Sequence, residues 1–217
     1  MTQFISSYYN QFEVRRLLDA IEDDPLRIVI VLTAYYGLRR SEVLGIKWEA
    51  IDFENKEIRI AHKIVNEKQN GKRVAVGHDS MKTKSSYRTL PLLPPVEEEL
   101  KIEKEKQEKM KLLMKKAYSY KDEEYVCVDS LGKLFRPEYI TDHFQVILRR
   151  NGLKKIRFHD LRHSCASIFL ANGEEMKKIQ NWLGHSNIST TADIYVHTDA
   201  KSKEPSGEII TKALAKV

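Results

Sequence analysis

Cysteine is scarce in this chain of 217 residues, which has only Cys127 and Cys165. Two cysteines cannot form the disulfide framework of a small secreted domain, and both stand in apolar stretches, so the sequence favours a reducing compartment. Long apolar runs are also absent. The best, residues 28–34, falls well short of the ~18 residues of a membrane span. No basic and apolar leader opens the chain, so secretion is not expected.

Repeats and low-complexity linkers are absent as well, which leaves one globular domain as the simplest organisation. Hydrophobic residues make up 41% of the chain and charged residues 31%. The 37 basic and 31 acidic residues give a net charge of 37 − 31, or +6. This excess is compatible with a polyanionic partner, although many other soluble proteins share it.

The periodicity of apolar residues predicts mostly helices around a small sheet. Alternation over residues 57–65 predicts a strand, and Asn70-Gly71 predicts a hairpin turn to a second strand at 72–76. A third strand is expected at 81–92 and a short one at 125–128. The predicted fold class is therefore α+β, a mostly helical single domain with a small three-stranded antiparallel sheet. Helices are expected at 6–23, from Pro25 to Gly37, from a cap at Ser41, and at 95–117, 137–150, 158–171, 174–183 and 189–196.

Polar groups that suit phosphate chemistry stand at the ends of several of these elements. Arg39 lies in a tight turn between Gly37 and Ser41, where a guanidinium and backbone N–H groups can meet an anion. An arginine paired with Glu42 at the surface is the simpler interpretation of this turn alone.

A second place is the predicted helix that contains His159, Arg162 and His163, which share one face because they are three and four residues apart. A proton-transfer group beside a fixed cation suits phosphoryl chemistry. The alternative for His-x-x-x-His is a zinc pair. Asp160 stands where the zinc motif has Glu, and Arg162 would bring a positive charge to the metal.

The remaining places are the basic stretch with Lys82, Lys84 and Arg88, then His185 after the Gly184 break, and Tyr195. Each alone has a simpler explanation, as a solvated loop or as packing. A further basic segment, residues 149–157, carries five positive and no negative charges, and phosphate-backbone contacts through it would weaken with salt.

Taken in order, these motifs resemble the catalytic domain of the tyrosine recombinases, or phage integrase family. In detail they are similar to the integrases of phages and of integrative conjugative elements. The resemblance spans roughly residues 17–197. It rests on Gly37-Leu-Arg39-x-Ser41-Glu42, Lys82-Thr83, His159-Asp-Leu-Arg162-His163, Leu183-Gly184-His185 and Thr191-x-x-x-Tyr195-x-His197.

The resemblance implies a role for each matching residue. Tyr195 would attack a scissile DNA phosphate and form a 3′-phosphotyrosyl link, which conserves the bond's free energy without ATP. Arg39 and Arg162 would grip the non-bridging oxygens, Lys82 would protonate the leaving 5′-oxygen, and His159 would act as general acid or base. His185 would donate a hydrogen bond to the phosphate. No metal or other cofactor is expected, and Glu42, Asp160 and His163 would support these residues.

The resemblance also sets expectations for organisation and partners. Residues 1–200 would form the catalytic domain, residues 201–217 would form a tail that docks on a neighbouring protomer, and the N-terminal core-binding and arm-binding domains would be missing. The expected partner is double-stranded DNA in the bacterial cytoplasm, bound by a tetramer that is perhaps monomeric without DNA, with no membrane involved. Direct DNA contacts are expected from Arg40, Lys84, Lys154, Lys155 and Arg157.

Three other functions stay open at this point. A type IB topoisomerase would use the same phosphotyrosine but relax DNA instead of exchanging strands. A zinc hydrolase would use His159, His163 and His185. A DNA-binding module derived from an integrase would keep the residues without the reaction.

Overall fold

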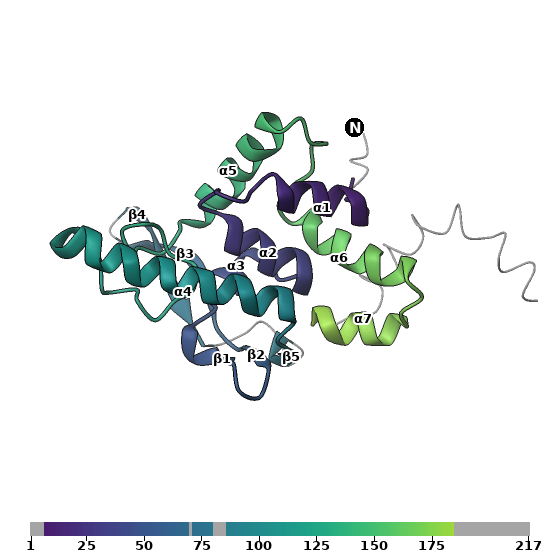
Figure 1. The fold of residues 1–217 in the computed structure, drawn as a ribbon, viewed down its shortest axis with the longest axis horizontal. Coiled ribbons are helices and arrows are strands. Elements are labelled where there is room, and N and C mark those ends of the chain that lie inside the picture. The colour runs from purple at the N-terminus through teal and green to yellow at the C-terminus, as the bar shows by residue number, and fades with distance from the viewer. Residues whose placement is uncertain (1–6, 70, 80–85, 185–217) are drawn as a thin grey trace, which may run out of the picture.

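The computed structural model describes residues 7–69, 71–79 and 86–184. Within these ranges helices dominate, and the strands are short (Figure 1). The helices are α1 (Gln11–Asp19), α2 (Arg27–Tyr36), α3 (Arg40–Leu44), α4 (Pro94–Met114), α5 (Pro137–Arg150), α6 (Asp160–Ala171) and α7 (Met176–Leu183), with 3-10 turns η1 (Trp48–Ala50) and η3 (Lys115–Ala117). The strands are β1 (Ile51–Asp52), β2 (Glu57–Ile60), β3 (Lys63–Gln69), β4 (Lys72–His78) and β5 (Arg88–Pro91).

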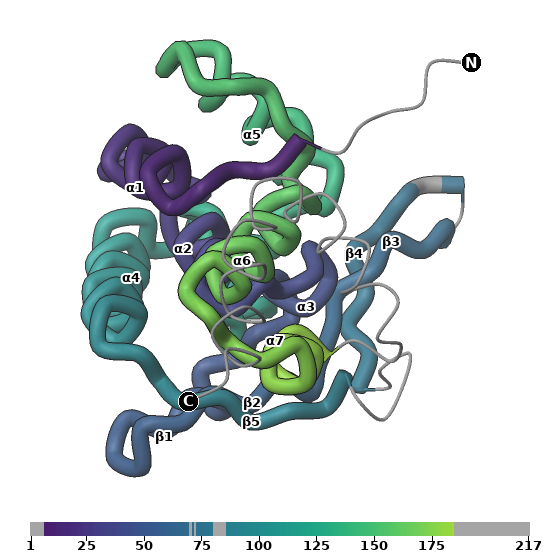
Figure 2. The backbone as a smooth tube through the Cα atoms, turned by 90° about the vertical axis from the view of Figure 1, so that its right-hand side faces the viewer, coloured from purple at the N-terminus to yellow at the C-terminus, as the bar shows by residue number. Residues whose placement is uncertain are grey.

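Helix α2 is the centre of the fold. Every residue from Ile28 to Ala34 is buried, which explains why this segment is apolar on all sides. Helices α1, α3, α4 and α6 all pack against it (Figures 1 and 2). Each buried aliphatic side chain contributes about 1.5–3 kcal/mol, so this helix anchors the elements that carry the predicted site.

The sequence predicted one three-stranded antiparallel sheet, whereas the described strands form two sheets. Strands β1, β2 and β5 form one antiparallel sheet, and β3 and β4 form a hairpin of their own. The predicted strand 57–65 is divided at Ala61 and His62, so its halves lie in different sheets. The predicted hairpin is confirmed by its register, because β3 and β4 are antiparallel and Gln69 pairs with Lys72.

Two predicted helix starts and one predicted strand differ from the structure. The Asn10 side chain accepts hydrogen bonds from the backbone of Phe12 and Glu13, so α1 is capped there and not at Ser6 or Ser7. Pro25 precedes α2 rather than lying in its first turn. Residues 125–128 form only isolated bridges, Lys47 to Tyr125 and Val128 to Leu134, not a strand.

The other helices agree well with the sequence. Helix α5 has the predicted bounds, and α6 and α7 each begin two residues later than expected. Helix α4 begins at Pro94 and carries ion pairs on its outer face, such as Lys101 with Glu97. No helix in the described part of the chain is long and apolar enough to cross a membrane. The predicted helix 189–196 and the tail 201–217 lie outside the described residues.

Candidate active site

The turn between α2 and α3 fixes the first predicted arginine. Gly37 ends α2 in the left-handed conformation, with φ at +61°. A Cβ atom on Gly37 would overlap Leu183 Cδ2, so a larger residue at this turn would force the Leu183 side chain of α7 to shift. Arg39, and not Ser41 as predicted, is the residue that precedes the first turn of α3. Its backbone N–H donates to Glu42 Oε2 at 3.1 Å, which satisfies an otherwise unpaired amide of the helix start.

Glu42 is the buried centre of this region. Its side chain is 3% exposed and accepts from two guanidiniums: Arg39 Nη1 reaches Oε1 at 2.6 Å, and Arg88 Nη2 reaches Oε2 at 3.1 Å. Burial acts to raise the pKa of Glu42, but the charges of Arg88, Arg39 and Arg162 outweigh it and hold the pKa below its ordinary value. Glu42 is therefore an anion that gathers arginines from three elements.

Arg162 on α6 is the most deeply placed of the three arginines. It is 1% exposed, donates from Nη1 to the Gly37 carbonyl at 2.6 Å, and donates from Nη2 to the Leu183 carbonyl at 2.8 Å. Burial and the neighbouring charge of Arg39 lower its pKa to about 9. At neutral pH Arg162 is still a cation, and it ties the α2–α3 turn to the end of α7.

Three successive carbonyls at the end of α7 each accept from a different arginine. Trp182 accepts from Arg88 Nε at 2.9 Å, Leu183 from Arg162, and Gly184 from Arg39 Nη2 at 3.4 Å. The C-terminal carbonyls of a helix have no partner within the helix and lie at the negative end of its dipole. These arginines therefore converge on the point from which the chain continues to His185.

His159 immediately precedes α6, and His163 lies one turn later, with the two ring centroids 5.5 Å apart. The His159 residue keeps an exposed edge, yet the loss of solvation on its protein side, aided by the charges of His163 and Arg162, lowers its pKa to about 4. Burial likewise lowers the pKa of His163. His159 is therefore neutral near pH 7 and can accept a proton.

Asp160 stabilises the turn in front of His159. Its carboxylate is fully buried and accepts from the backbone N–H of Arg157 at 2.8 Å and from Arg157 Nη2 at 2.7 Å. Burial opposes ionisation, but the hydrogen bonds from Arg157 keep the pKa of Asp160 below its ordinary value. Asp160 thus holds the loop that precedes His159.

The residues predicted to contact DNA are spread over the surface. Arg40 donates to the Pro137 carbonyl and, at 2.6 Å, to Thr141 Oγ1, so it fastens α3 to α5. Lys154 donates to the Tyr8 carbonyl and pairs with Glu13, and both Lys154 and Lys155 are exposed. Lys82, Lys84, His185 and Tyr195 lie outside the described residues.

Arg88 is the buried cation that sequence reasoning passed over. It belonged to the basic stretch around Lys82 but received no role, although its side chain is 6% exposed. The available signal was its position at an inward-facing end of a strand, where a charge needs a buried partner. That partner, Glu42, is 46 residues away in the chain, so the pattern alone could not identify it.

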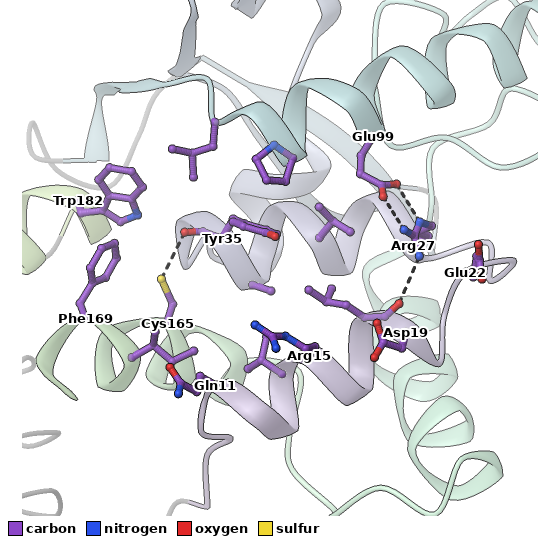
Figure 3. A pocket seen from close by; sticks show the side chains of 17 residues that line it. Gln11, Arg15, Asp19, Glu22, Arg27, Tyr35, Glu99, Cys165, Phe169 and Trp182 are labelled. Atoms are coloured by element: carbon purple, nitrogen blue, oxygen red, sulfur yellow. Dashed lines mark hydrogen bonds and ion pairs between the residues drawn. The ribbon is translucent and has the colours of Figure 1, made fainter. Parts of the chain in front are cut away.

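A separate apolar groove of about 960 Å³ runs between α1, α2, α4 and α6 (Figure 3). Cys165 lies at one end, with its Sγ 3.5 Å from the Tyr35 carbonyl, beside Phe169 and Trp182. At the other end Arg27 pairs with Glu99.

Both cysteines, Cys127 and Cys165, are buried free thiols. The described residues contain no group of three or more His, Cys, Asp or Glu side chains able to hold a metal ion.

Comparison with known proteins places this geometry in a family. A sequence model described as the phage integrase family matches residues 8–202. The chain is 33% identical over 201 residues to a protein named tyrosine recombinase XerC-like from Caldanaerobacter subterraneus, covering 90% of this chain and 51% of that protein. It is 26% identical over 199 residues to the ICEBs1 integrase of Bacillus subtilis, covering 91% and 52%. The chain thus spans about half the length of these curated relatives.

Solved structures agree on the fold. The Tn1549 transposon integrase in complex with transposon right end DNA superposes with a TM-score of 0.73 at 20% identity, covering 99% of this chain and 68% of that one. The XerA recombinase superposes with a TM-score of 0.65, also at 20% identity, covering 100% and 66%. The α+β fold is therefore that of a tyrosine recombinase catalytic domain, and the chain belongs to the phage integrase family.

Proposed function

We propose that this chain is the catalytic domain of a site-specific DNA recombinase that cuts and rejoins strands through Tyr195. The observation that carries the proposal is the convergence of Arg39, Arg88 and Arg162 on one carboxylate and one helix end. Three cations around a single anion leave a positive excess, which suits the charge that accumulates on a phosphorane-like transition state. Gathering three like charges costs electrostatic free energy, which a turn with only a structural role would not need to spend.

In this reaction the Tyr195 oxygen forms a bond to the scissile phosphorus while the bond from phosphorus to the 5′-oxygen breaks. The phenol proton passes to neutral His159, and Lys82 gives a proton to the leaving 5′-oxygen. The guanidinium of Arg39 and the positive charge of Arg162 stabilise the non-bridging oxygens, with His185 as a further donor. A 5′-hydroxyl of the partner strand then attacks the phosphotyrosine and releases Tyr195, so the number of phosphodiester bonds is unchanged.

Glu42, Asp160 and His163 support the reacting groups in this proposal. Glu42 orients Arg39, Asp160 holds the turn before His159, and His163 keeps the pKa of His159 low. The DNA backbone would lie across the basic segment with Lys154, Lys155 and Arg157, and across Arg40 and Lys84. The reaction would take place in the bacterial cytoplasm, at the nucleoid.

We further propose that residues 201–217 dock on a neighbouring protomer when a tetramer assembles on DNA. The tail carries Ile210, Ala213, Leu214 and Val217 at helical spacing, with Lys212 and Lys216 between them. The groove of Figure 3 offers an apolar floor and acidic residues at its rim, including Asp19 and Glu22, which match such a segment. Deleting residues 206–217 should abolish multimers on DNA, measured by light scattering, while leaving the thermal unfolding temperature nearly unchanged.

Covalent trapping tests the main proposal without knowledge of the target sequence. The protein is incubated with a pool of nicked duplexes of randomised sequence, so that a short cleaved fragment diffuses away and the adduct persists. We expect a tryptic peptide with a nucleotide phosphate on Tyr195, and none from Tyr195→Phe. An adduct that persists in Tyr195→Phe would refute the assignment of the nucleophile. No adduct at all would favour a DNA-binding module.

Two further measurements separate the alternative enzymes. A topoisomerase would relax a supercoiled plasmid without joining strands of different duplexes, whereas a recombinase joins them. A zinc hydrolase would contain stoichiometric zinc and lose activity with a chelator, which is not expected here.

A further inference from the structure

Arg88 contacts helices α3 and α7 and the nearby residue Ser86 from one buried side chain. Its Nη2 donates to Glu42 Oε2 at 3.1 Å, its Nε donates to the Trp182 carbonyl at 2.9 Å, and its Nη1 donates to the Ser86 carbonyl at 3.2 Å. Burial lowers its pKa, and the charge of Glu42 acts to raise it. A planar fork with several donors can satisfy all three acceptors, which the single ammonium of lysine cannot.

Glu42 divides its two oxygens between Arg88 and Arg39. Arg39 Nη1 takes Oε1 at 2.6 Å, whereas the second oxygen serves Arg88 and the Arg39 backbone amide. The Arg39 side chain is 35% exposed, while those of Arg88 and Glu42 are 6% and 3% exposed. Arg39 is therefore the member of the trio that faces outward, and Arg88 is sealed behind it.

The charge balance explains what Arg88 adds. With both arginines present, one carboxylate stands between two cations and a net positive charge remains on the outward side. Without Arg88, the Glu42 carboxylate would neutralise Arg39 more fully, because one competing cation is gone, and its freed oxygen would accept the remaining Arg39 donors. Both effects would weaken the attraction of Arg39 for an anion.

We propose that Arg88 is a positioning residue for Arg39: by occupying one oxygen of Glu42, it keeps the Arg39 guanidinium outward and positively charged for phosphate. This inference rests on the proposed function, in which Arg39 binds the scissile phosphate. Arg88 also couples that site to the end of α7 through Trp182, and it follows Lys82 by six residues in the chain.

The test measures binding of inorganic phosphate to the full chain by calorimetry, below the unfolding temperature of each variant. We expect Arg88→Met to bind phosphate roughly three- to tenfold more weakly than the wild type, the range typical of coupled contact pairs. Adding Glu42→Gln to Arg88→Met removes the competing carboxylate, so the double variant should return to within about twofold of the wild type. A residue that only stabilises the fold would show no such rescue.

Three controls make the outcome decisive. Lys47→Met removes one half-buried cation that pairs with Glu124, and it should bind phosphate as the wild type does. Arg88→Lys keeps the charge but loses the planar fork, and it replaces Arg88→Met if that variant does not fold; a smaller loss, again rescued by Glu42→Gln, is expected. Arg39→Met identifies the part of the binding that depends on Arg39.

Each result has one meaning. If Arg39→Met binds phosphate as tightly as the wild type, the anion site of the proposed function is wrong and the inference falls with it. If Arg39→Met weakens binding but Arg88→Met or Arg88→Lys does not, only the inference is overturned. Loss without rescue by Glu42→Gln also overturns it, because the effect then does not pass through the shared carboxylate.

Discussion

Arg162 Nη1 lies 2.6 Å from the carbonyl oxygen of Gly37, although the two residues are 125 positions apart in the chain. The other terminal nitrogen of the same guanidinium holds Leu183. One side chain therefore joins the turn that presents Arg39 to the helix that precedes His185. Motifs that are far apart in the sequence therefore lie close together, and the side chain of one motif holds the backbone of the others.

The first prediction concerns this link. Arg162→Lys keeps the charge but cannot reach both carbonyls, so one buried acceptor loses its partner, at a cost of about 1–3 kcal/mol. We expect the free energy of unfolding in urea to fall by that amount. Arg73→Lys, at an exposed pair with Glu138, should change it by less than about 0.5 kcal/mol. Equal losses in both variants would contradict the structural role of Arg162.

The second prediction separates backbone strain from steric contact at Gly37. Gly37 and Gly152 have nearly the same φ, +61° and +59°, but a Cβ on Gly152 would meet nothing within 4 Å. Gly152→Ala should therefore cost only the strain of the left-handed conformation, about 1–2 kcal/mol. Gly37→Ala should cost about 1–3 kcal/mol more, because Leu183 must move. Urea unfolding measures both, and similar values would argue against the close approach of α7.

The third prediction is a pH dependence of stability. The pKa of His159 is about 4 in the folded chain against an ordinary value of 6.5, so between these values the unfolded chain binds a proton that the folded chain does not. Stability should therefore fall as the pH is lowered from about 6.5 towards 4. His159→Gln should lose less stability over this interval, measured by urea unfolding at several pH values. An unchanged slope would show that His159 is not the source.

The fourth prediction concerns DNA binding by the segment before α6. Lys155 is exposed, whereas Lys154 is engaged with Tyr8 and Glu13. Lys155→Ala should weaken binding to random duplex DNA. The slope of log K against log[salt] should become shallower by about 0.9, the value for one phosphate contact, measured by fluorescence anisotropy. Lys109→Ala, on the exposed face of α4, serves as the charge-matched control and should keep the wild-type slope.

The sequence predicted the helices well where local signals act alone. The bounds of α5 follow from Pro137 at its first position and from a clear apolar period. The division of the strand at Ala61 and His62 was not predicted, because it depends on tertiary packing: a Cβ on Gly45 would lie 2.5 Å from the His62 carbonyl, so α3 meets the chain there.

In the candidate site, too, local patterns were predicted and contacts between distant elements were not. The arginine and histidine motifs were recognisable from residue type and spacing, and the structure brings Arg39, Glu42 and Arg162 together. The position of Arg39 before α3, in place of Ser41, depends on the carboxylate of Glu42 reaching its amide. Arg88 escaped notice because its function depends on a partner from another element, and single-sequence periodicity carries no such information.

The grip on the last three carbonyls of α7 has a mechanical consequence. Because Arg88, Arg162 and Arg39 hold Trp182, Leu183 and Gly184 respectively, the end of this helix is fixed to the arginine cluster. If Arg39 and Arg162 bind the scissile phosphate as proposed, any displacement of this helix end would also displace the groups that hold the DNA backbone.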